Sequence, residues 1–438
     1  MAVQIIALLT FVAVFVIAEL RRSHIGIVMF AAAAGMGLLV AGLALDDIVA
    51  GFPIDILILL VGVTYFFGIA KANGTIGRLV DRALVLVGSN TAALPLTFFL
   101  LTAAVSAMGS PLGGLVMAPI GMSVAHRRRI DPMLMGLAIG TGLSAGAFAP
   151  TSLFGIVTWG TANTAGIALN PLTLFAVAVI VNLVLLAAAY LMFGSRSRAR
   201  TAMSTVSTAG GAVTTGGGDE PEAGEERPAR EPFETIHLVT VVAMLGLIAA
   251  VVVLAILGNN PDVGVLAFAF GAALTLIDPD NGRGALREID WSTVLLVGGI
   301  ITYVGVLQEI GAVDLLGDLA AMMTVPLLAA LVICAVGGLV SAFASTTGIL
   351  AALVPLAIPL IEQGGVAGWA LICALGVCSS IVDVSPFSTV GATLVATTVD
   401  PDERPRMTAL LTRWGLSMVV IGPVVLVGTL VLPAMAFQ

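Results

Sequence analysis

Charged residues are scarce in this chain of 438 residues. Asp, Glu, Lys and Arg together make up 10% of the sequence, whereas a soluble domain carries about 25% charged residues. Apolar residues make up 59%, which is far more than a packed water-soluble core needs. The composition excludes a soluble globular protein, and we predict an all-α polytopic membrane protein.

Several chemical motifs are absent. The sequence has no nucleotide-binding loop, no Gly-x-Ser-x-Gly nucleophile elbow and no HExxH pair. The three cysteines, Cys334, Cys373 and Cys378, lie inside apolar segments, a placement that matches neither a disulfide framework nor a metal site. We therefore expect no catalytic residues, no enzyme activity and no cofactor. With a net charge of -8 and no basic face, no nucleic-acid partner is expected either.

A single threading of the apolar segments puts every strong cation on one side of a membrane. Segments of about 20 apolar residues recur along the chain, and each can cross roughly 30 Å of hydrocarbon as a helix. Because cytoplasmic loops retain Lys and Arg, the side with the cations is predicted to be cytoplasmic, in the cell (inner) membrane, with both termini outside. The cations are one lysine and otherwise arginines: Arg21, Arg22, Lys71, Arg78, Arg82, Arg127, Arg128, Arg129, Arg196, Arg198, Arg200, Arg227, Arg230, Arg283, Arg287, Arg404, Arg406 and Arg413.

Residues 1–194 are predicted to form a first repeat of five membrane-spanning helices and one re-entrant hairpin. The hairpin covers 91–125, because a single crossing there would carry the arginines at 127–129 to the outside. Its polar, Gly-rich tip fits this interpretation, since helical backbone breaks in a membrane only where protein or water covers it. The spans are predicted at 3–20, 25–44, 54–72, 133–162 and 171–193, with 133–162 broken around Pro150.

Residues 195–233 are rich first in Ser, Thr, Gly and Ala and then in Asp, Glu, Pro and Arg. Such a tract cannot bury enough apolar surface to order itself, so we predict a flexible, disordered cytoplasmic linker. Residues 234–438 are predicted to form a second repeat, with a hairpin at 325–361 that enters from outside and a helix at 366–398 broken near Pro386. The other spans are predicted at 236–257, 263–277, 291–307 and 410–435.

The two halves share residues at a nearly constant offset. Ser106 recurs as Ser341 at an offset of 235, and Ser144 recurs as Ser380 at an offset of 236. Such matches lie at the hairpin tip and at the broken helix of each half, which favours duplication over chance. An odd number of crossings per half inverts the second copy, so we predict two inverted repeats, the arrangement of alternating-access carriers.

Each half contributes a hairpin tip and a broken helix, and these are predicted to meet near the bilayer midplane. Broken helices expose unpaired N–H groups, which suit oxyanions, and unpaired carbonyls, which suit a small cation such as Na⁺. No Arg or Lys occurs at the tips, so an anion would be held by helix dipoles, hydroxyls and co-bound cations. Small residues in membrane helices also serve close packing, and this alternative stays open for each of them. The candidate substrate-binding residues are Ser106, Ser110, Gly113, Thr151, Ser152, Ser345, Thr346, Thr347, Ser385 and Ser388.

Asp383 is the most specific single candidate for a functional residue, because it lies in the middle of the broken helix at 366–398. A buried carboxylate in a membrane is costly unless it is paired, so it is a functional hypothesis by default. We predict an ion-coupling role for Asp383 with Ser110 and Ser345, in which Asp383 either ligates Na⁺ or carries a proton. The alternative is a structural hydrogen bond to the hairpin backbone.

The paired hairpins and the Ser/Thr-Pro breaks resemble the ion transporter superfamily, which includes the divalent anion/sodium symporters and the MatC-type dicarboxylate (malonate) carriers. The segments 106–114 and 140–152 look most like the MatC-type carriers. The resemblance implies secondary transport of a small dicarboxylate by an elevator-like movement, often in a homodimer. The symporters carry Ser-Asn-Thr at both tips, whereas the tips here, at 109–111 and 345–347, lack Asn. The choice between Na⁺ and H⁺ therefore stays open.

The expected partners are a small organic anion and membrane lipid. Two alternatives remain: a cation/proton or metalloid-anion antiporter of the same fold, and, from another class, a channel or a non-transporting receptor. The three histidines, His24, His126 and His237, lie beside cytoplasmic ends and are expected to be solvated.

Overall fold

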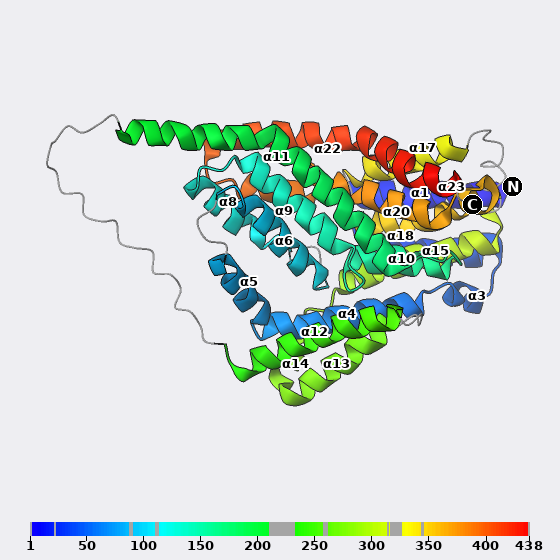
Figure 1. Cartoon of the computed structure of the whole chain (residues 1–438). Helices are drawn as coiled ribbons and strands as arrows, with labels where there is room; N and C mark the ends of the chain where they lie inside the picture. Colours follow the sequence, from blue (N-terminus) through cyan, green and yellow to red (C-terminus); the bar gives the residue numbers. More distant parts are fainter. Residues whose placement is uncertain are drawn as a thin grey trace.

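The computed structural model is a bundle of helices that run roughly along one common direction (Figure 1). Every regular element in the part of the chain that the structure describes is helical, so the predicted all-α class is confirmed. Four helices within it are long and apolar enough to cross a membrane. The structure describes residues 2–21, 23–86, 91–109, 114–209, 233–256, 262–312, 315, 326–342 and 346–436.

The helix bounds in the first half follow the predicted spans closely. The apolar runs end where Gly, Pro or charged residues appear, because these residues stop helices or prefer water. The elements are α1 (Ala2–Arg21), α2 (Ile25–Ala34) with its π-helical continuation η1 (Gly35–Ala41), α3 (Leu45–Ala50), α4 (Ile54–Ala72), α5 (Thr75–Leu86), α6 (Leu94–Ala107), α8 (Met117–Arg127), α9 (Pro132–Ala147), α10 (Leu153–Thr164) and α11 (Pro171–Ala209).

The second half repeats much of this order of elements. Its members are α12 (Thr235–Ile256), α13 (Val263–Ile277), α14 (Pro279–Ala285), α15 (Trp291–Glu309), α17 (Pro326–Ser341), α18 (Thr346–Leu356), α19 (Ile358–Gly364), α20 (Gly368–Ile381), α21 (Thr389–Ala396), η2 (Pro401–Glu403), α22 (Arg404–Leu426), η3 (Val427–Val431) and α23 (Leu432–Ala436).

Two helices extend beyond the spans predicted for the membrane. The span predicted to end at 193 continues as α11 to Ala209, so the first part of the predicted linker at 195–233 is helical. No Gly or Pro occurs between Ser195 and Ala209, and nothing there stops a helix that already extends from the membrane segment. The last span begins at Arg404 rather than at 410. The rest of the linker, 210–232, lies outside the described residues.

Both predicted hairpins have antiparallel arms. In the first, Gly121 on α8 lies against Phe98 on α6, and Gly114 lies against Ser106 near the tip. In the second, Gly337 on α17 lies against Leu353 on α18. Each chain segment thus turns back on itself instead of forming one straight span. The re-entrant course of the hairpins in the membrane stays a prediction.

Both termini lie at one end of the bundle (Figure 1). We call the opposite end, where α8 ends at Arg127 and α22 begins at Arg404, the arginine-rich end. At the arginine-rich end Lys71 pairs with Glu288 at 2.5 Å, and Arg406 pairs with Asp131 at 2.8 Å. At the other end the Gln4 amide donates to two carbonyls just after α15, each at 3.0 Å. Each of these contacts joins two helix ends that the predicted topology places on the same side of the membrane. The side of the membrane that each end faces stays a prediction.

We divide the helices by their contacts into two groups, which we call bodies. In one, α2 packs on α15 and α4 packs on α13 and α14; in the other, α6 and α11 pack on α9, and α17 and α22 pack on α20. The second body contains both hairpins and both broken helices. The bodies meet where α10 contacts α4 and where α18 contacts α15.

Candidate functional site

The two broken helices meet directly through a pair of serines. The hydroxyl oxygens of Ser144 on α9 and Ser380 on α20 lie 2.8 Å apart, and both residues are buried. These two serines are the counterparts found at an offset of 236 in the sequence. A contact between equivalent residues is expected on a pseudo-two-fold axis, so the pair supports the predicted duplication at this point. The opposite orientation of the two halves stays a prediction.

The two breaks have the same backbone geometry. The amide of Ser152 donates to the carbonyl of Ala149 at 2.9 Å, and the amide of Ser388 donates to that of Ser385 at 2.9 Å. Each break contains a proline, at 150 and 386, which cannot continue a helix. Each break is followed by a glycine, because the next helical turn lies very close to the break. A Cβ on Gly155 would lie 2.2 Å from a carbonyl oxygen of the break, and a Cβ on Gly391 would lie 2.1 Å from one.

The first break is tied to the first hairpin. The Thr151 hydroxyl donates to the carbonyl of Ala107 at 2.7 Å, and the Ser152 hydroxyl donates to the carbonyl of Ser106 at 2.6 Å. These carbonyls belong to the last turn of α6, which has no helical donors left for them. The structure therefore brings Ser106, Thr151 and Ser152 together, as predicted. The hydroxyls of Thr151 and Ser152 hold the break against the end of α6.

The Ser106 hydroxyl is itself buried and has no partner among the described residues, and the same is true of Thr102 one turn earlier. Buried hydroxyls without a partner are rare and costly, so an unfilled polar site is expected beside them. At the hairpin tip Gly114 lies against the Ser106 hydroxyl and against the methyl group of Thr102. The candidates Ser110 and Gly113, in the same tip, lie outside the described residues.

The second break is tied to the second hairpin through Asp383. The Asp383 carboxyl interacts with the hydroxyls of Ser388 and Thr346, and Thr346 also lies 2.8 Å from the Ser341 hydroxyl. The Ser388 hydroxyl donates to the carbonyls of Asp383 and Ser385, and it accepts from the Gly391 amide at 3.2 Å. Ser388 thus caps α21, an N-cap role that serine commonly has.

The remaining predicted residues of this hairpin and break are buried nearby. Thr347 follows Thr346 at the start of α18, and Ser385 packs against Gly415 of α22. Ser345 lies outside the described residues. No ion pair of Asp383 is found among the residues that the structure describes, so its carboxyl is held there by hydroxyl groups rather than by a cation.

Asn182 on α11 is a site residue that the sequence analysis did not single out. Its amide nitrogen donates to the Ser144 hydroxyl at 3.1 Å and to the carbonyl of Ala178 at 2.9 Å, whereas its amide oxygen is buried without a described partner. The only sequence signal was an amide inside an apolar run. Asn182 extends the Ser144–Ser380 contact to a third helix.

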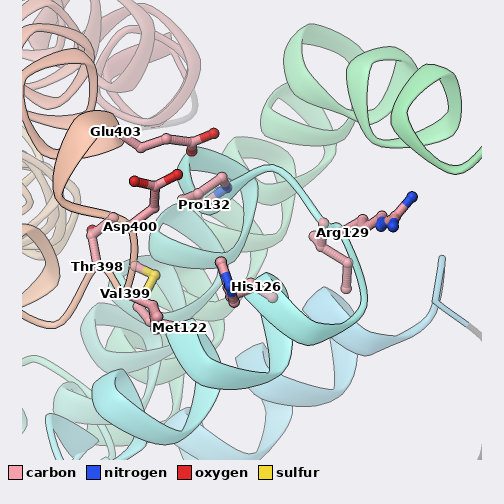
Figure 2. Close-up of a pocket in the computed structure, with 10 residues that line it drawn as sticks. Met122, His126, Arg129, Pro132, Thr398, Val399, Asp400 and Glu403 are labelled. Atoms are coloured by element: carbon pink, nitrogen blue, oxygen red, sulfur yellow. The ribbon is translucent and has the colours of Figure 1, made fainter. Parts of the chain in front are cut away.

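A cavity of about 440 Å³ lies at the arginine-rich end, away from both breaks (Figure 2). One wall comes from the end of α8 and the turn into α9, including Met122 and His126, and the other comes from the turn between α21 and η2. In Figure 2 the Asp400 and Glu403 carboxylates lie on the second wall, and Arg129 points away from them. None of the predicted site residues lines this cavity. No cluster of His, Cys, Asp and Glu that could hold a metal occurs in the described ranges.

Interrupted apolar helices in a helical bundle are typical of multi-pass membrane transporters. Residues 1–147 match the family model described as dicarboxylate carrier protein MatC N-terminus, which confirms the resemblance to MatC-type carriers over this part of the chain. No curated protein matches the chain.

The fold is also similar to that of a solved transporter. The YdaH transporter of Alcanivorax borkumensis superposes with a TM-score of 0.60 at 13% identity, over 87% of this chain and 86% of that one. At this identity the likeness concerns the fold alone. The family match and the shared fold together support a multi-pass membrane transporter.

Proposed function

We propose that the protein is a secondary active transporter of small dicarboxylates, of the C4-dicarboxylate or malonate type, driven by a Na⁺ or H⁺ gradient. The observation that carries this proposal is the meeting of two related helix breaks at Ser144 and Ser380. After each break a new helix begins, α10 on one side and α21 on the other. Two related helix N-termini suit a ligand with two carboxylates, since each N-terminus favours one negative charge.

The coupling ion is proposed to act at Asp383. Its carboxyl contacts hydroxyls of both the second break and the second hairpin, and a carboxylate without a cationic partner in a membrane protein is suited to bind Na⁺ or a proton. A bound cation there would also offset the charge of the dicarboxylate. Ser110 and Ser345 complete the proposed ion-coupling set.

The proposed mechanism is elevator-like alternating access, in which the body with both hairpins slides against the other. The contacts between the bodies support it, because they are apolar: Gly160 of α10 lies against Ile56 of α4, and Gly348 of α18 lies against Leu296 of α15. Apolar surfaces can slide without breaking ion pairs. Two inverted repeats and a homodimer, with membrane lipid around it, are part of the same proposal.

The test is uptake of radiolabelled malonate or succinate into proteoliposomes under a Na⁺ or a H⁺ gradient. We expect saturable uptake that unlabelled dicarboxylate competes away. A Ser106→Ala variant should transport less, whereas Thr429→Ala, which changes an exposed hydroxyl on η3, is the matched control and should not. Absence of uptake of either anion under both gradients would refute the proposal. Flux of Na⁺ or arsenite without an organic anion would instead favour an antiporter, and unsaturable currents a channel.

A further inference from the structure

The two broken helices cross in opposite directions where their bonded serines meet. Val384, in the second break, lies against Gly140 on α9. Phe148, in the first break, lies against Gly376 on α20. These two contacts are counterparts of each other, because each position in the first half corresponds to the position 236 residues later. The bonded serines lie between the two contacts, and thus on the local axis that relates the two breaks.

The serine pair, Ser144 and Ser380, lies at two helix C-termini. Ser144 is in the last turn of α9, which ends at Ala147, and Ser380 is in the last turn of α20, which ends at Ile381. The C-terminal end of a helix carries a partial negative charge of about half an elementary charge, which acts over the last turn. Among the described residues, the hydrogen bonds of the serine pair come from neutral groups only. A positive charge at this point would therefore be stabilised by both helix ends.

The orientation of the Asn182 amide beside this pair is fixed. Its nitrogen donates to the carbonyl of Ala178 at 2.9 Å and to the Ser144 hydroxyl at 3.1 Å. Because a carbonyl only accepts, the NH₂ group has to face Ala178, and the amide cannot be turned around. The amide oxygen is thus the atom that is buried without a partner among the described residues, in a side chain that is 0% exposed. Such an oxygen requires a hydrogen-bond donor or a cation.

The protons of the two serine hydroxyls are already used. Ser380 donates to the carbonyl of Val377 at 3.1 Å, so Ser144 has to donate in the bond of 2.8 Å between the two hydroxyls. A serine hydroxyl has one proton and two acceptor positions. Each hydroxyl therefore keeps one free acceptor position, and the Asn182 oxygen keeps both of its own. These three oxygens can accept but not donate, which excludes an anion and suits a cation or a water molecule.

Two observations favour a cation over water and over simple packing. The negative helix ends stabilise a positive charge and give a neutral water molecule no such advantage. The counterpart of Asn182 at the offset of 236 is Met418, which is also buried, so packing at this place in the second half needs no amide. Neutral oxygens suit a hard ion of single charge, whereas divalent ions rely on carboxylates. Amide and hydroxyl oxygens take up no proton near neutral pH, so Na⁺ fits the site best.

We propose that Asn182, Ser144 and Ser380 form a binding site for one sodium ion where the two broken helices cross. The side-chain oxygens of three helices, α9, α11 and α20, hold the ion, which stabilises both helix ends at once. The ligands differ from those of the ion proposed at Asp383, whose carboxyl contacts the hydroxyls of the second hairpin and break. That this second ion is coupled to dicarboxylate uptake rests on the proposed function.

The direct test is equilibrium binding of radioactive Na⁺ to the purified full-length protein in detergent, without dicarboxylate and with choline keeping the ionic strength constant. The parent protein carries Asp383→Asn, which removes the other proposed ion site. We expect this parent to bind Na⁺ saturably. Adding Asn182→Leu should raise the half-saturating Na⁺ concentration about 10- to 100-fold, which is about 1.4–2.8 kcal/mol and matches the strength of a bond to a charged group.

Two further variants make the test specific. Ser380→Ala removes one ligand by a small change and should also weaken Na⁺ binding, so it decides the question if Asn182→Leu does not fold. Thr302→Val removes a buried hydroxyl on α15, outside the site, and should bind Na⁺ as the parent does. The proposal is overturned if the Asp383→Asn parent binds no Na⁺, because the ion then lies at Asp383 or a water molecule fills the site. It is also overturned if Ser380→Ala and Asn182→Leu bind Na⁺ as the parent does.

Uptake of succinate into proteoliposomes at increasing external Na⁺ is the second readout, and it alone depends on the proposed function. Here Asn182→Leu is made in the wild-type chain and should need about tenfold more Na⁺ for half-maximal uptake, whereas Thr302→Val should need the wild-type concentration. If none of these proteins transports succinate while the binding results hold, the proposed function fails and the sodium site stands. If Asn182→Leu weakens Na⁺ binding but leaves the Na⁺ dependence of uptake unchanged, the coupling of this ion to transport is refuted.

Discussion

Replacing Gly391 by alanine tests the geometry of the second helix break. A Cβ at this position would lie 2.1 Å from the carbonyl oxygen of Ser385, which is 1.3 Å short of the 3.4 Å where ordinary contact begins. The atom in the way is backbone, so no side chain can rotate aside. The turn at the break therefore has to move by about 1 Å, a displacement that at a functional site can cost about 100-fold in rate.

The effect on stability has a sign that can be checked against a matched variant. Alanine is favoured over glycine in a helix by about 1 kcal/mol, whereas forcing an atom into a filled space costs about 1–3 kcal/mol. Gly428→Ala, where the new Cβ meets nothing within 4 Å, should show only the gain. Gly391→Ala and its counterpart Gly155→Ala should show the cost.

The assay is thermal unfolding of the purified variants in detergent, together with dicarboxylate uptake per mole of protein in proteoliposomes. We expect Gly391→Ala and Gly155→Ala to unfold at lower temperature than wild type and to transport at a small fraction of its rate. Gly428→Ala should unfold at the wild-type temperature or above it and transport normally. If Gly391→Ala unfolds and transports as wild type does, the close approach at the break, and the site built on it, are wrong.

Three other predictions concern the centre and the arginine-rich end. Asp383→Asn should reach the membrane in normal amounts but lose ion-coupled uptake. If this variant transports at wild-type rates in proteoliposomes between about pH 5 and about pH 8, Asp383 does not have the proposed role. Ser144→Cys combined with Ser380→Cys, in a background without the native cysteines, should form a disulfide. After cleavage of the linker, this disulfide should keep the two halves together on a non-reducing gel. Separate halves would contradict the contact at 2.8 Å. Arg406→Gln should lower the free energy of unfolding by about 1–3 kcal/mol, because it leaves the Asp131 carboxylate, 1% exposed, without its partner; an unchanged unfolding temperature would show that the pair contributes little.

Each of these has an internal control. Arg283→Gln removes a cation whose side chain is 79% exposed and whose partner Asp280 is 95% exposed, so it should leave stability nearly unchanged. Ser144→Cys alone in the same background leaves a single thiol and should therefore give no disulfide between the halves. Asp280→Asn, at the surface, is the matched control for Asp383→Asn.

The sequence located most helices because their signal is local. A run of about 20 apolar residues is stable in a membrane only as a helix, and charged residues mark where the run has to end. The spans predicted at 54–72 and 263–277 therefore have the same bounds in α4 and α13. The count of the arginines at 127–129 against the side they had to reach also predicts that the segment 91–125 turns back on itself, whereas its re-entrant course in the membrane stays a prediction.

The same local rule explains the misses. The helix α5 has arginines at 78 and 82 and lacks a long apolar run, so the sequence offered no membrane signal for it. The extension of α11 to Ala209 has a polar composition that predicts a linker, but no helix breaker is present to end the helix at the membrane. In both cases helix formation and membrane insertion are separate properties, and the hydropathy pattern reports only the second.

The sequence by itself determined the all-helical class, the two interruptions in each half and the small polar residues that line them. Only the tertiary structure decided which residues meet: Ser144 with Ser380, Thr151 with the end of α6, and His237 with Asn73. The physical reason is that a hydrogen bond between residues 236 or 164 positions apart depends on how whole helices pack, whereas hydrophobic length and helix breaking depend on neighbours along the chain. His237 is 3% exposed, contrary to the expectation that it would be solvated, because a buried histidine and a solvated one have the same sequence signature and packing alone separates them.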